Sequence, residues 1–189
     1  MKRTLYTLAI FAVLSGCSDQ APETPPAEQA AAPVEAPTDT ASDASEEKPE
    51  STVLGIANKS EADVGAALGQ PIETEAGEWT LLPSEEKTPM IRNVYAQEAG
   101  KVEVLFIEGK AVRIGFYPKS TFKYPDDAIK AMRAAGLSVE DGAEPESEAP
   151  HFLDFGGIDG MYAVRVVKDL EGNPENIGYV KIVTEERYK

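Results

Sequence analysis

Two residue types that often serve as nucleophile and general base occur once each in this protein. Cys17 is the sole thiol and His151 the sole imidazole in 189 residues. A thiolate is a strong nucleophile, whereas one histidine cannot form a two-histidine metal site within one chain. We interpret His151, after Pro150 at a predicted strand start, as a surface side chain, with a catalytic base as the alternative. Neither a Gly-x-Ser-x-Gly nucleophile motif nor a phosphate-binding loop occurs, so we predict no catalytic residue, metal or cofactor.

Two acidic motifs resemble functional sites of other proteins. The segment "DFGG" at 154–157 resembles the metal-binding triplet of protein kinases, but the glycine-rich loop, lysine and catalytic loop that accompany it are absent. The segment "DLEGNPEN" at 169–176 begins like a calcium-binding loop, but Pro174 replaces the glycine expected at its sixth position, and Val180 stands where the twelfth requires glutamate. We predict a strand end with a glycine turn for the first and a hairpin turn for the second.

The first sixteen residues have the layout of an export signal. Lys2 and Arg3 precede an apolar run of about ten residues, which is short of the roughly 20 that a membrane-spanning helix needs. Small residues follow at Ser15 and Gly16. A basic start, a short apolar region and small residues before the cleavage point are typical of a secretory signal peptide.

The end of this signal, Leu14-Ser15-Gly16-Cys17, resembles the lipobox of bacterial lipoproteins. The resemblance implies cleavage after residue 16 and attachment of a diacylglyceryl group to Cys17, followed by acylation of the freed amine with a fatty acid such as palmitate. Two or more acyl chains give stable membrane anchoring. The residue after the cysteine is Ser18, which in that family favours the outer over the inner membrane. An ordinary cleaved signal peptide is the alternative.

Residues 17–50 form a segment of biased composition. Positions 18–50 contain eight alanines, six prolines and nine acidic residues against one base, Lys48. Such a segment cannot bury enough apolar surface to offset the entropy lost on ordering. We predict a disordered acidic tether that holds a domain away from the membrane.

The formal charge of the whole chain is −15. Loss of Lys2 and Arg3 with the signal leaves −17, of which −8 lies in the tether and −9 on residues 51–189. This balance argues against binding of nucleic acid through its phosphates and against a peripheral grip on anionic lipid.

Residues 51–189 have the size of one domain. Ser60 and Asp63 indicate a helix start, with Val64, Ala67 and Leu68 on one helix face and a stop at Gly69. A second helix is predicted from about Pro125 to Ala135, with Asp126 and Asp127 in its first turn, Ile129 and Met132 on its buried side and Gly136 as its stop. Apolar alternation predicts strands at 78–82, 91–97, 102–106, 112–116, 152–155, 161–167 and 177–183.

The predicted fold class is therefore α+β: an antiparallel sheet with two short helices packed on one face. A sheet built from two similar helix-plus-sheet halves is an open variant, because "EADVGAALG" and "DDAIKAMRAAG" both end at a glycine before strands. The helix ending in "LGQP" and the hairpin "GKVEVLFIEGKAV" are similar to small envelope lipoproteins of the SmpA/OmlA kind. That resemblance implies a helix-on-sheet domain in envelope or outer-membrane assembly. The acidic tether and the second half lie outside it.

The aromatic residues offer candidate contacts for a partner. Most of those on the predicted strands are expected in the core, whereas Trp79 and Tyr95 are candidates for a partner-binding surface, where tryptophan is enriched. We expect Arg92 and Arg113 to pair with acids across the sheet.

The leading hypothesis is a bacterial lipoprotein of the periplasm or cell surface. It would present a non-catalytic domain to an envelope protein partner while the lipid confines it near the membrane. A solute- or envelope-polymer-binding lipoprotein is the second hypothesis and requires a concave pocket lined by several aromatics. An enzyme is the third and requires clustered acids of perturbed pKa.

Overall fold

The structure is a computed structural model that describes residues 53–189. The predicted signal peptide at 1–16, the lipidation site Cys17 and the tether that ends at residue 50 lie outside the described residues. Within the described part, no helix has the length and apolar character needed to cross a bilayer.

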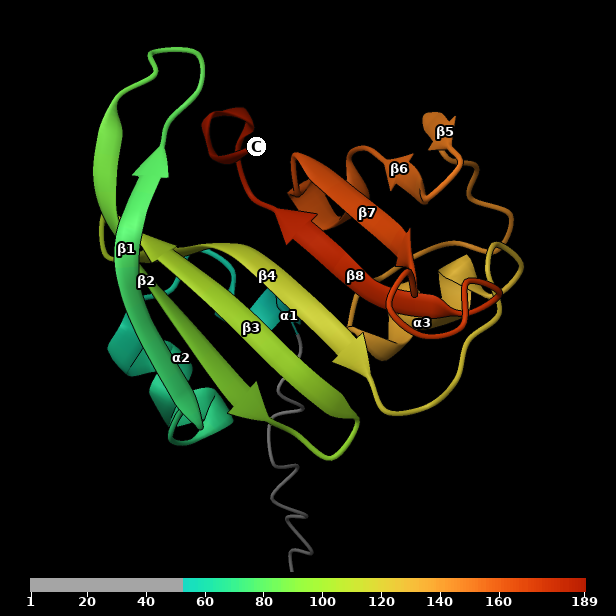
Figure 1. The fold of residues 1–189 in the computed structure, drawn as a ribbon, viewed down its shortest axis with the longest axis horizontal. Helices are drawn as coiled ribbons and strands as arrows, with labels where there is room; N and C mark the ends of the chain where they lie inside the picture. The colour runs from blue at the N-terminus through green and yellow to red at the C-terminus, as the bar shows by residue number, and fades with distance from the viewer. Residues whose placement is uncertain (1–52) are drawn as a thin grey trace, which may run out of the picture. The chain divides into compact units, whose positions relative to one another are not determined.

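The described chain forms one eight-stranded antiparallel sheet with helices behind it (Figure 1). The strands lie side by side in the order β1-β2-β3-β4-β8-β7-β6-β5. The strands are β1 (Glu73–Thr80), β2 (Lys87–Ala96), β3 (Gly100–Ile107), β4 (Lys110–Pro118), β5 (Ser147–Ala149), β6 (Phe152–Phe155), β7 (Ala163–Lys168) and β8 (Ile177–Val183). The helices are α1 (Val53–Ile56), α2 (Glu61–Leu68) and α3 (Ala128–Ala134), with 3₁₀ turns at η1 (Ile158–Gly160) and η2 (Glu186–Tyr188).

The sheet consists of two halves with the same order of elements. In each half one helix precedes four antiparallel strands, α2 with β1–β4 and α3 with β5–β8. The last strands of the two halves, β4 and β8, pair with each other over residues 113–116 and 180–183. The predicted α+β class, an antiparallel sheet with short helices on one face, is confirmed. The order of elements also agrees with the variant left open, a sheet of two helix-plus-sheet halves. The predicted count of three strands after the second helix is wrong, because β5 lies within residues 140–150, a segment rich in acidic residues for which no strand is predicted.

The main core lies between the helices and one face of the sheet. Fully buried side chains from each helix (Ile56, Val64 and Met132) pack in one cluster with side chains from the strands. Strand residues of that cluster include Val104, Phe106, Ile114, Phe116, Leu153, Phe155, Val164, Val166, Val180 and Ile182. Burial of each large aliphatic or aromatic side chain contributes about 1.5–3 kcal/mol, so this face holds the two halves together.

Helix α2 begins as its sequence predicts. The Asp63 backbone N–H donates to Ser60 Oγ at 3.2 Å, and the Ser60 hydroxyl donates to Asp63 Oδ2 at 2.7 Å. These hydrogen bonds hold the pKa of the Asp63 carboxyl below its ordinary value. Val64 and Leu68 are buried, but Ala67 is exposed, which corrects its predicted place on the buried face. Gly69 ends the helix with a φ of 90°.

Helix α3 is shorter than predicted. It begins at Ala128 instead of Pro125, because residues 125–127 form turns in which Asp127 accepts hydrogen bonds from the Lys123 backbone N–H and the Lys130 ammonium. Those bonds hold the pKa of the Asp127 carboxyl below its ordinary value. Met132 is fully buried, whereas Ile129 is only partly buried against the core.

The β3–β4 hairpin matches its sequence signature. Glu108 and Gly109 have φ angles of 53° and 75° and form the two-residue turn. Positive φ at both central positions suits the right-handed twist of a hairpin.

The edge strand β1 departs most from prediction. It spans 73–80 instead of 78–82, because seven of its eight residues are exposed and give no apolar alternation. Strand β2 likewise starts four residues before the predicted position 91.

Candidate functional site

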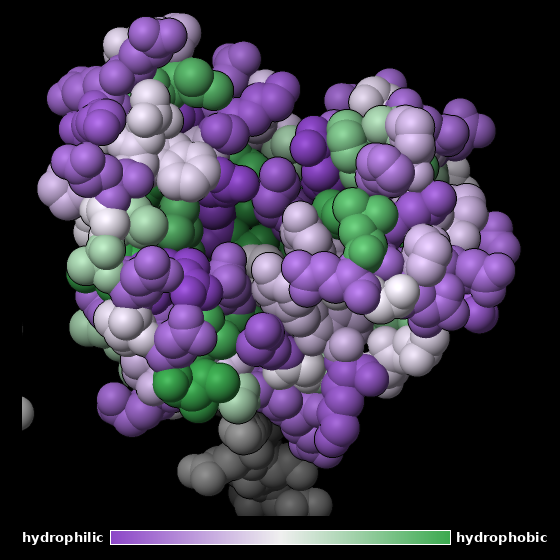
Figure 2. Space-filling view, in the orientation of Figure 1, coloured by the Kyte–Doolittle hydropathy of each residue, from purple (hydrophilic) through white to green (hydrophobic). Residues whose placement is uncertain are grey.

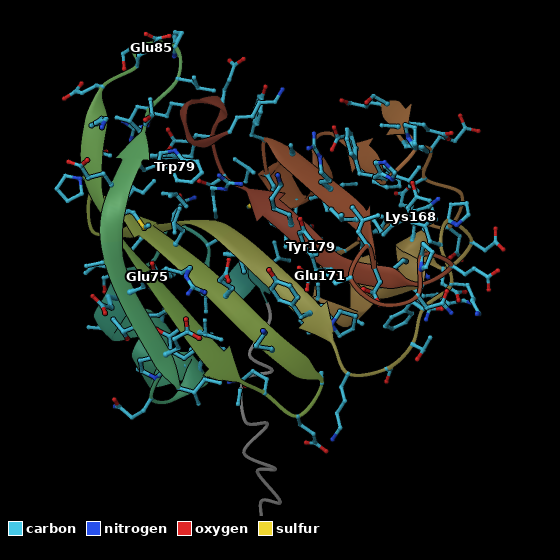
Figure 3. The ribbon with its side chains drawn as sticks, viewed as in Figure 1. Glu75, Trp79, Glu85, Lys168, Glu171 and Tyr179 are labelled. Carbon is cyan, nitrogen blue, oxygen red and sulfur yellow. The ribbon has the colours of Figure 1, made fainter. Side chains whose placement is uncertain are left out.

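The sheet face opposite the helices carries the functional candidates. Alternation along the strands points Arg113 and Tyr117 of β4, and Tyr179 and Lys181 of β8, away from the main core. Figure 3 shows Tyr179 and Trp79 projecting from this face, which we call the open face. A hollow of about 330 Å³ lies on it. Its lining comprises Trp79, Met90, Arg92, Glu103, Leu105, Arg113, Ile114, Gly115, Tyr117, Tyr179 and Lys181.

One end of the open face is closed by the C-terminus. Tyr188 of η2 is fully buried there and packs with Leu105, Ile107, Val112 and Val183 in a second, smaller core cluster. The Tyr188 hydroxyl donates to Glu108 at 3.2 Å. Figure 2 shows the remaining face hollowed in its middle, with hydrophilic side chains around the depression and both apolar and hydrophilic ones deeper within it. The hollow is therefore a shaped depression rather than a flat sheet surface.

Two tyrosines at the junction of the halves form one side of the hollow. The rings of Tyr117 and Tyr179 stack with centroids 5.1 Å apart and an interplanar angle of 27°. Burial, together with the charge of Glu103, raises the pKa of the Tyr117 phenol to about 12. Tyr117 therefore keeps its proton at neutral pH and remains a hydrogen-bond donor. Gly115 also lines the hollow, and a Cβ there would come within 3.2 Å of the Tyr117 ring.

Trp79 forms another side and is half-buried. The Arg113 guanidinium lies 4.2 Å from its ring centroid, a cation–π distance. Strands β2 and β3 lie between β1 and β4 in the sheet, so this contact brings the end of β1 over the open face. The indole N–H of Trp79 is buried and has no hydrogen-bond partner among the described residues.

Basic side chains occupy the centre of the open face. Lys181 lies directly opposite Arg165 of β7 and opposite Gly115 of β4, two pairs along from the pair of Arg113 with Val183. Arg165 is neutralised by Asp154, with nitrogen–oxygen distances of 2.6 and 2.7 Å. Within residues 53–189, neither Arg113 nor Lys181 forms an ion pair with a carboxylate.

This arrangement perturbs the titration of both unpaired bases. Burial, followed by the charges of Arg113 and Arg165, lowers the pKa of the Lys181 ammonium to about 8. Burial also lowers the pKa of Arg113 below its ordinary value. Arginine nevertheless stays protonated in proteins, so Arg113 is a permanent, half-buried cation.

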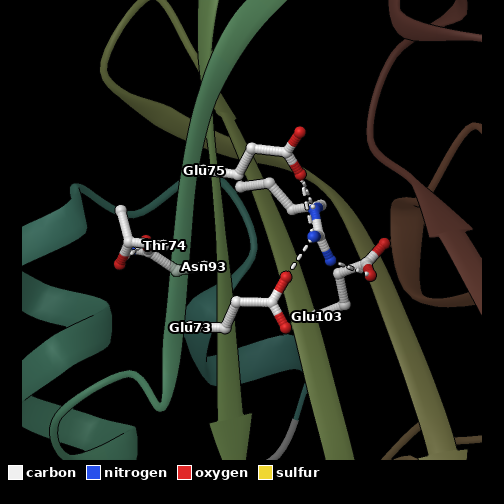
Figure 4. Close-up of polar contacts among 6 residues, drawn as sticks. Glu73, Thr74, Glu75, Asn93 and Glu103 are labelled. Carbon is white, nitrogen blue, oxygen red and sulfur yellow. Dashed lines mark hydrogen bonds and ion pairs between the residues drawn. The ribbon is translucent and has the colours of Figure 1, made fainter. Parts of the chain in front are cut away.

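Arg92, at the β2 side of the hollow, differs from Arg113 and Lys181 because it forms ion pairs with carboxylates. Its guanidinium contacts Glu73 and Glu75 of β1 and Glu103 of β3, the last at 3.0 Å (Figure 4). These three carboxylates raise the pKa of Arg92 above its ordinary value. The expected cross-sheet pairing is therefore confirmed for Arg92 and is wrong for Arg113, which contacts Trp79 instead.

The two predicted partner-binding aromatics lie apart. Trp79 lines the hollow on the open face, whereas Tyr95 is 1% exposed in the main core, where its hydroxyl accepts a hydrogen bond from Asn93 at 3.3 Å. Tyr95 therefore offers no surface to a partner, because it points beneath the helices. His151 is exposed, and its backbone carbonyl accepts a hydrogen bond from the Lys168 N–H at 3.0 Å.

Sequence interpretation missed Tyr179 and Lys181, although a signal for them exists. In "IGYVKIV" the two residues alternate with buried valine and isoleucine, so they share one face.

The segment "DLEGNPEN" is a turn, as predicted: Asp169 accepts hydrogen bonds from the backbone N–H groups of Gly172 and Asn173. Among residues 53–189, no group of three or more His, Cys, Asp or Glu side chains has a metal-binding arrangement.

Comparisons with known proteins give little similarity. No family model matches the chain, and no curated protein matches it. One similar solved structure is an extracellular protein containing a SCP domain from Bacillus anthracis strain Ames, with 17% identity and a TM-score of 0.47. The alignment covers 81% of this chain and 50% of that one.

A second is a cysteine-rich secretory protein from Staphylococcus aureus, with 12% identity, a TM-score of 0.43, and coverage of 74% and 48%. The chain thus spans about half the length of each. These values are too low to transfer a property of either protein to this chain.

Proposed function

We propose that this protein is an exported, lipid-anchored lipoprotein of the bacterial envelope whose α+β domain binds a solute or an envelope polymer on the open face. The observation that carries the binding proposal is the hollow lined by Trp79, Tyr117 and Tyr179. Ligand sites are concave, with apolar and aromatic walls and a few placed polar groups. The domain is non-catalytic in this proposal.

The anchor rests on the lipobox resemblance of residues 14–17. Acyl chains on Cys17 would hold the protein on its membrane, with Ser18 favouring the outer membrane, and the acidic tether would present the domain to the periplasm or the surface. Confinement near the membrane raises the effective concentration of the domain at a ligand in the same envelope.

An envelope protein partner is the second candidate and uses the same face. Tryptophan and arginine are the residues enriched at strong protein–protein contacts, and Trp79 with Arg113 is such a pair on the open face. The enzyme hypothesis required clustered acids of perturbed pKa. The described carboxyls with shifted pKa, Asp63 and Asp127, lie at helix starts away from the hollow.

The first experiment tests the anchor. Wild-type protein and Cys17→Ala are expressed in the native host with radiolabelled palmitate, and the envelope is fractionated. We expect label and membrane retention in the wild type alone. If Cys17→Ala fractionates like the wild type, the lipoprotein proposal is wrong.

The second experiment tests the binding face. A photo-crosslinking phenylalanine analogue replaces Tyr179 on the open face, and in a matched control it replaces Ala62, which is exposed on α2. Irradiation of intact cells should give a defined adduct only at position 179. A small-molecule or polymer adduct supports the leading proposal, a protein adduct supports the second candidate, and equal yield at both positions contradicts a binding role for the open face.

A further inference from the structure

The centre of the open face has a charge opposite to that of the domain. Residues 51–189 carry a formal charge of −9, so carboxylates greatly outnumber the bases they could neutralise. Nevertheless Arg113 and Lys181, both half-buried, line the hollow without a carboxylate partner among the described residues. A buried charge is costly unless it is paired.

Neither base removes this cost within the fold. Arg113 cannot lose its proton, and its contact with the Trp79 ring is weaker than an ion pair in a dry site. Lys181 has the Arg165 guanidinium directly across the strand pair and Arg113 on its other side, and like charges opposite each other destabilise a sheet. Asp154, whose charge acts on Lys181, directs both carboxylate oxygens to Arg165.

Two other bases on the open face, Arg92 and Arg165, are neutralised by carboxylates of the chain. Arg92 contacts three glutamates, and Arg165 is held by both oxygens of one aspartate. Arg113 and Lys181 line the hollow as Arg92 does, but neither forms an ion pair with a carboxylate among the described residues. A negatively charged group from outside the chain fits that position.

We propose that Arg113 and Lys181 jointly bind an oxyanion, a carboxylate or phosphate of the ligand, in the hollow between Trp79 and the Tyr117–Tyr179 stack. The planar guanidinium suits two oxygens at once, whereas the ammonium acts as a point charge. The stacked tyrosines and Trp79 offer flat surfaces for the rest of the ligand, and the Tyr117 hydroxyl is a further donor. This inference rests on the proposed function and narrows its ligand to an anionic one.

Proton linkage follows from the surroundings of Lys181. The bases around it are Arg113 on β4, Arg165 on β7, Arg92 on β2 and Lys189 at the chain end. The other charged and titratable groups are the acids Asp154 on β6, Glu103 on β3 and Glu146 just before β5, and the tyrosines Tyr117 on β4, Tyr162 just before β7 and Tyr179 on its own strand. An added anion would stabilise the charged ammonium and raise the pKa of Lys181 from about 8. Affinity for the anion should therefore fall as the pH rises above 8.

The test is an NMR titration of the lysine side chains in the full mature chain in non-ionic detergent. The probes are inorganic phosphate and glucuronate, with glucose as the uncharged counterpart of glucuronate and chloride at matched ionic strength. We expect a saturable shift of the Lys181 signal and a rise of its pKa with at least one of the two anions. Phosphate alone would indicate a free phosphate ligand, and preferential binding of glucuronate an acidic saccharide.

The variants are Arg113→Gln and Lys181→Gln, with Lys110→Gln as control because it removes an equal charge from an exposed position on β4. Each hollow variant should weaken anion binding about tenfold, the equivalent of roughly 1.4 kcal/mol, and the control less than about twofold. Circular dichroism verifies folding of all three. The proposal is wrong if neither anion gives a saturable shift in the millimolar range, or if Lys110→Gln loses as much affinity as Lys181→Gln.

This outcome is separable from that of the proposed function. Loss of lipid labelling or of the position-179 adduct would remove the envelope-binding role while leaving the anion titration intact. A failed titration with an intact adduct would leave the binding face and reject its anionic ligand.

Discussion

The two halves of the sheet have the same order of elements but differ in the carboxylate partners they give to the basic side chains of the open face. In the first half, β1 supplies Glu73 and Glu75 to Arg92, and β3 adds Glu103. At the junction and in the second half, Arg165 has Asp154 and Lys181 has no carboxylate partner among the described residues. The edge strands explain part of this contrast, since β1 has eight residues and β5 only three.

The comparison distinguishes Arg92 with its three glutamates, which we call the structural cluster, from Arg113 and Lys181, to which we assign ligand binding. Arg92 bridges three neighbouring strands and satisfies the acids of an exposed edge, which also discourages edge-to-edge pairing with another chain. Arg113 and Lys181 lie where β4 meets β8, far from either edge, and there the fold leaves room for a ligand. A base with several carboxylates is suited to stabilising the sheet, whereas the half-buried bases without one are those for which we propose ligand binding.

The largest expected effect tests whether the halves form one cooperative unit. Ile114 and Ile182 face each other across the β4–β8 pair, and both are fully buried. Ile114→Ala should lower the free energy of unfolding by about 2–5 kcal/mol, measured by urea denaturation with a single transition. Ile72→Ala, at a side chain 66% exposed, is the control and should stay within about 0.5 kcal/mol. Two separate transitions would show that the halves unfold independently.

The second effect concerns the structural cluster. Arg92→Gln leaves three glutamates close together, so we expect a loss of about 1–2 kcal/mol, given about 0.2–1 kcal/mol for each half-exposed pair. The loss should shrink in high salt because screening weakens such pairs. Lys87→Gln, which removes the exposed 3.6 Å contact with Glu78, should change stability far less. Equal losses for the two variants would refute a special role for the Arg92 cluster.

The third variant, Lys181→Met, should stabilise the protein, whereas the first two destabilise it. Lys181 binds fewer protons in the folded protein than in the unfolded chain between pH 8 and its ordinary pKa of 10.5, so its charge opposes folding below pH 8 and stability rises with pH across that window. Lys181→Met should therefore stabilise the ligand-free protein at pH 7 by about 1–2 kcal/mol, with solvent screening taken into account.

This gain should vanish as the pH approaches 10.5, and urea unfolding at several pH values would measure it. Lys110→Met is the matched control and should show no such trend. A loss of stability at pH 7 in Lys181→Met would mean that the ammonium has a stabilising contact, and would remove the contrast with Arg92.

The fold was predictable where burial shapes the sequence. The β3–β4 hairpin and β8 each bury one face against the main core, so valine, isoleucine and phenylalanine alternate with other residues over most of their length. Strands β1 and β5 are mostly exposed and leave no apolar pattern. Ladder pairing with a neighbouring strand holds both, and β1 is also held by ion pairs with Arg92. The pairing of β4 with β8 joins segments far apart in the chain, and no local signal specifies it.

The site was less predictable than the fold. Trp79 was a candidate, but its contact with Arg113 depends on the end of β1 lying over β4. Tyr95 and Tyr179 are both strand tyrosines, but Tyr95 points into the main core and Tyr179 onto the open face. The register of each strand determines which face a side chain occupies. A base within an apolar strand, as in "AVRVVK" and "YVKIV", is the local signal that should have drawn attention to β7 and β8.

The smallest expected effect compares the helices that begin the two halves. Ser60 accepts a hydrogen bond from the backbone of α2, whereas Asp127 makes no side-chain cap bond to α3. Ser60→Ala should therefore lower stability by about 0.5–1 kcal/mol, and Asp127→Asn, which keeps an oxygen at the start of α3, by less. Thermal unfolding of both variants would measure the difference. If Asp127→Asn lowers stability more than Ser60→Ala does, the turn before α3 contributes more to stability than the cap of α2. The two helix starts would then be similar in sequence but not in energetic role.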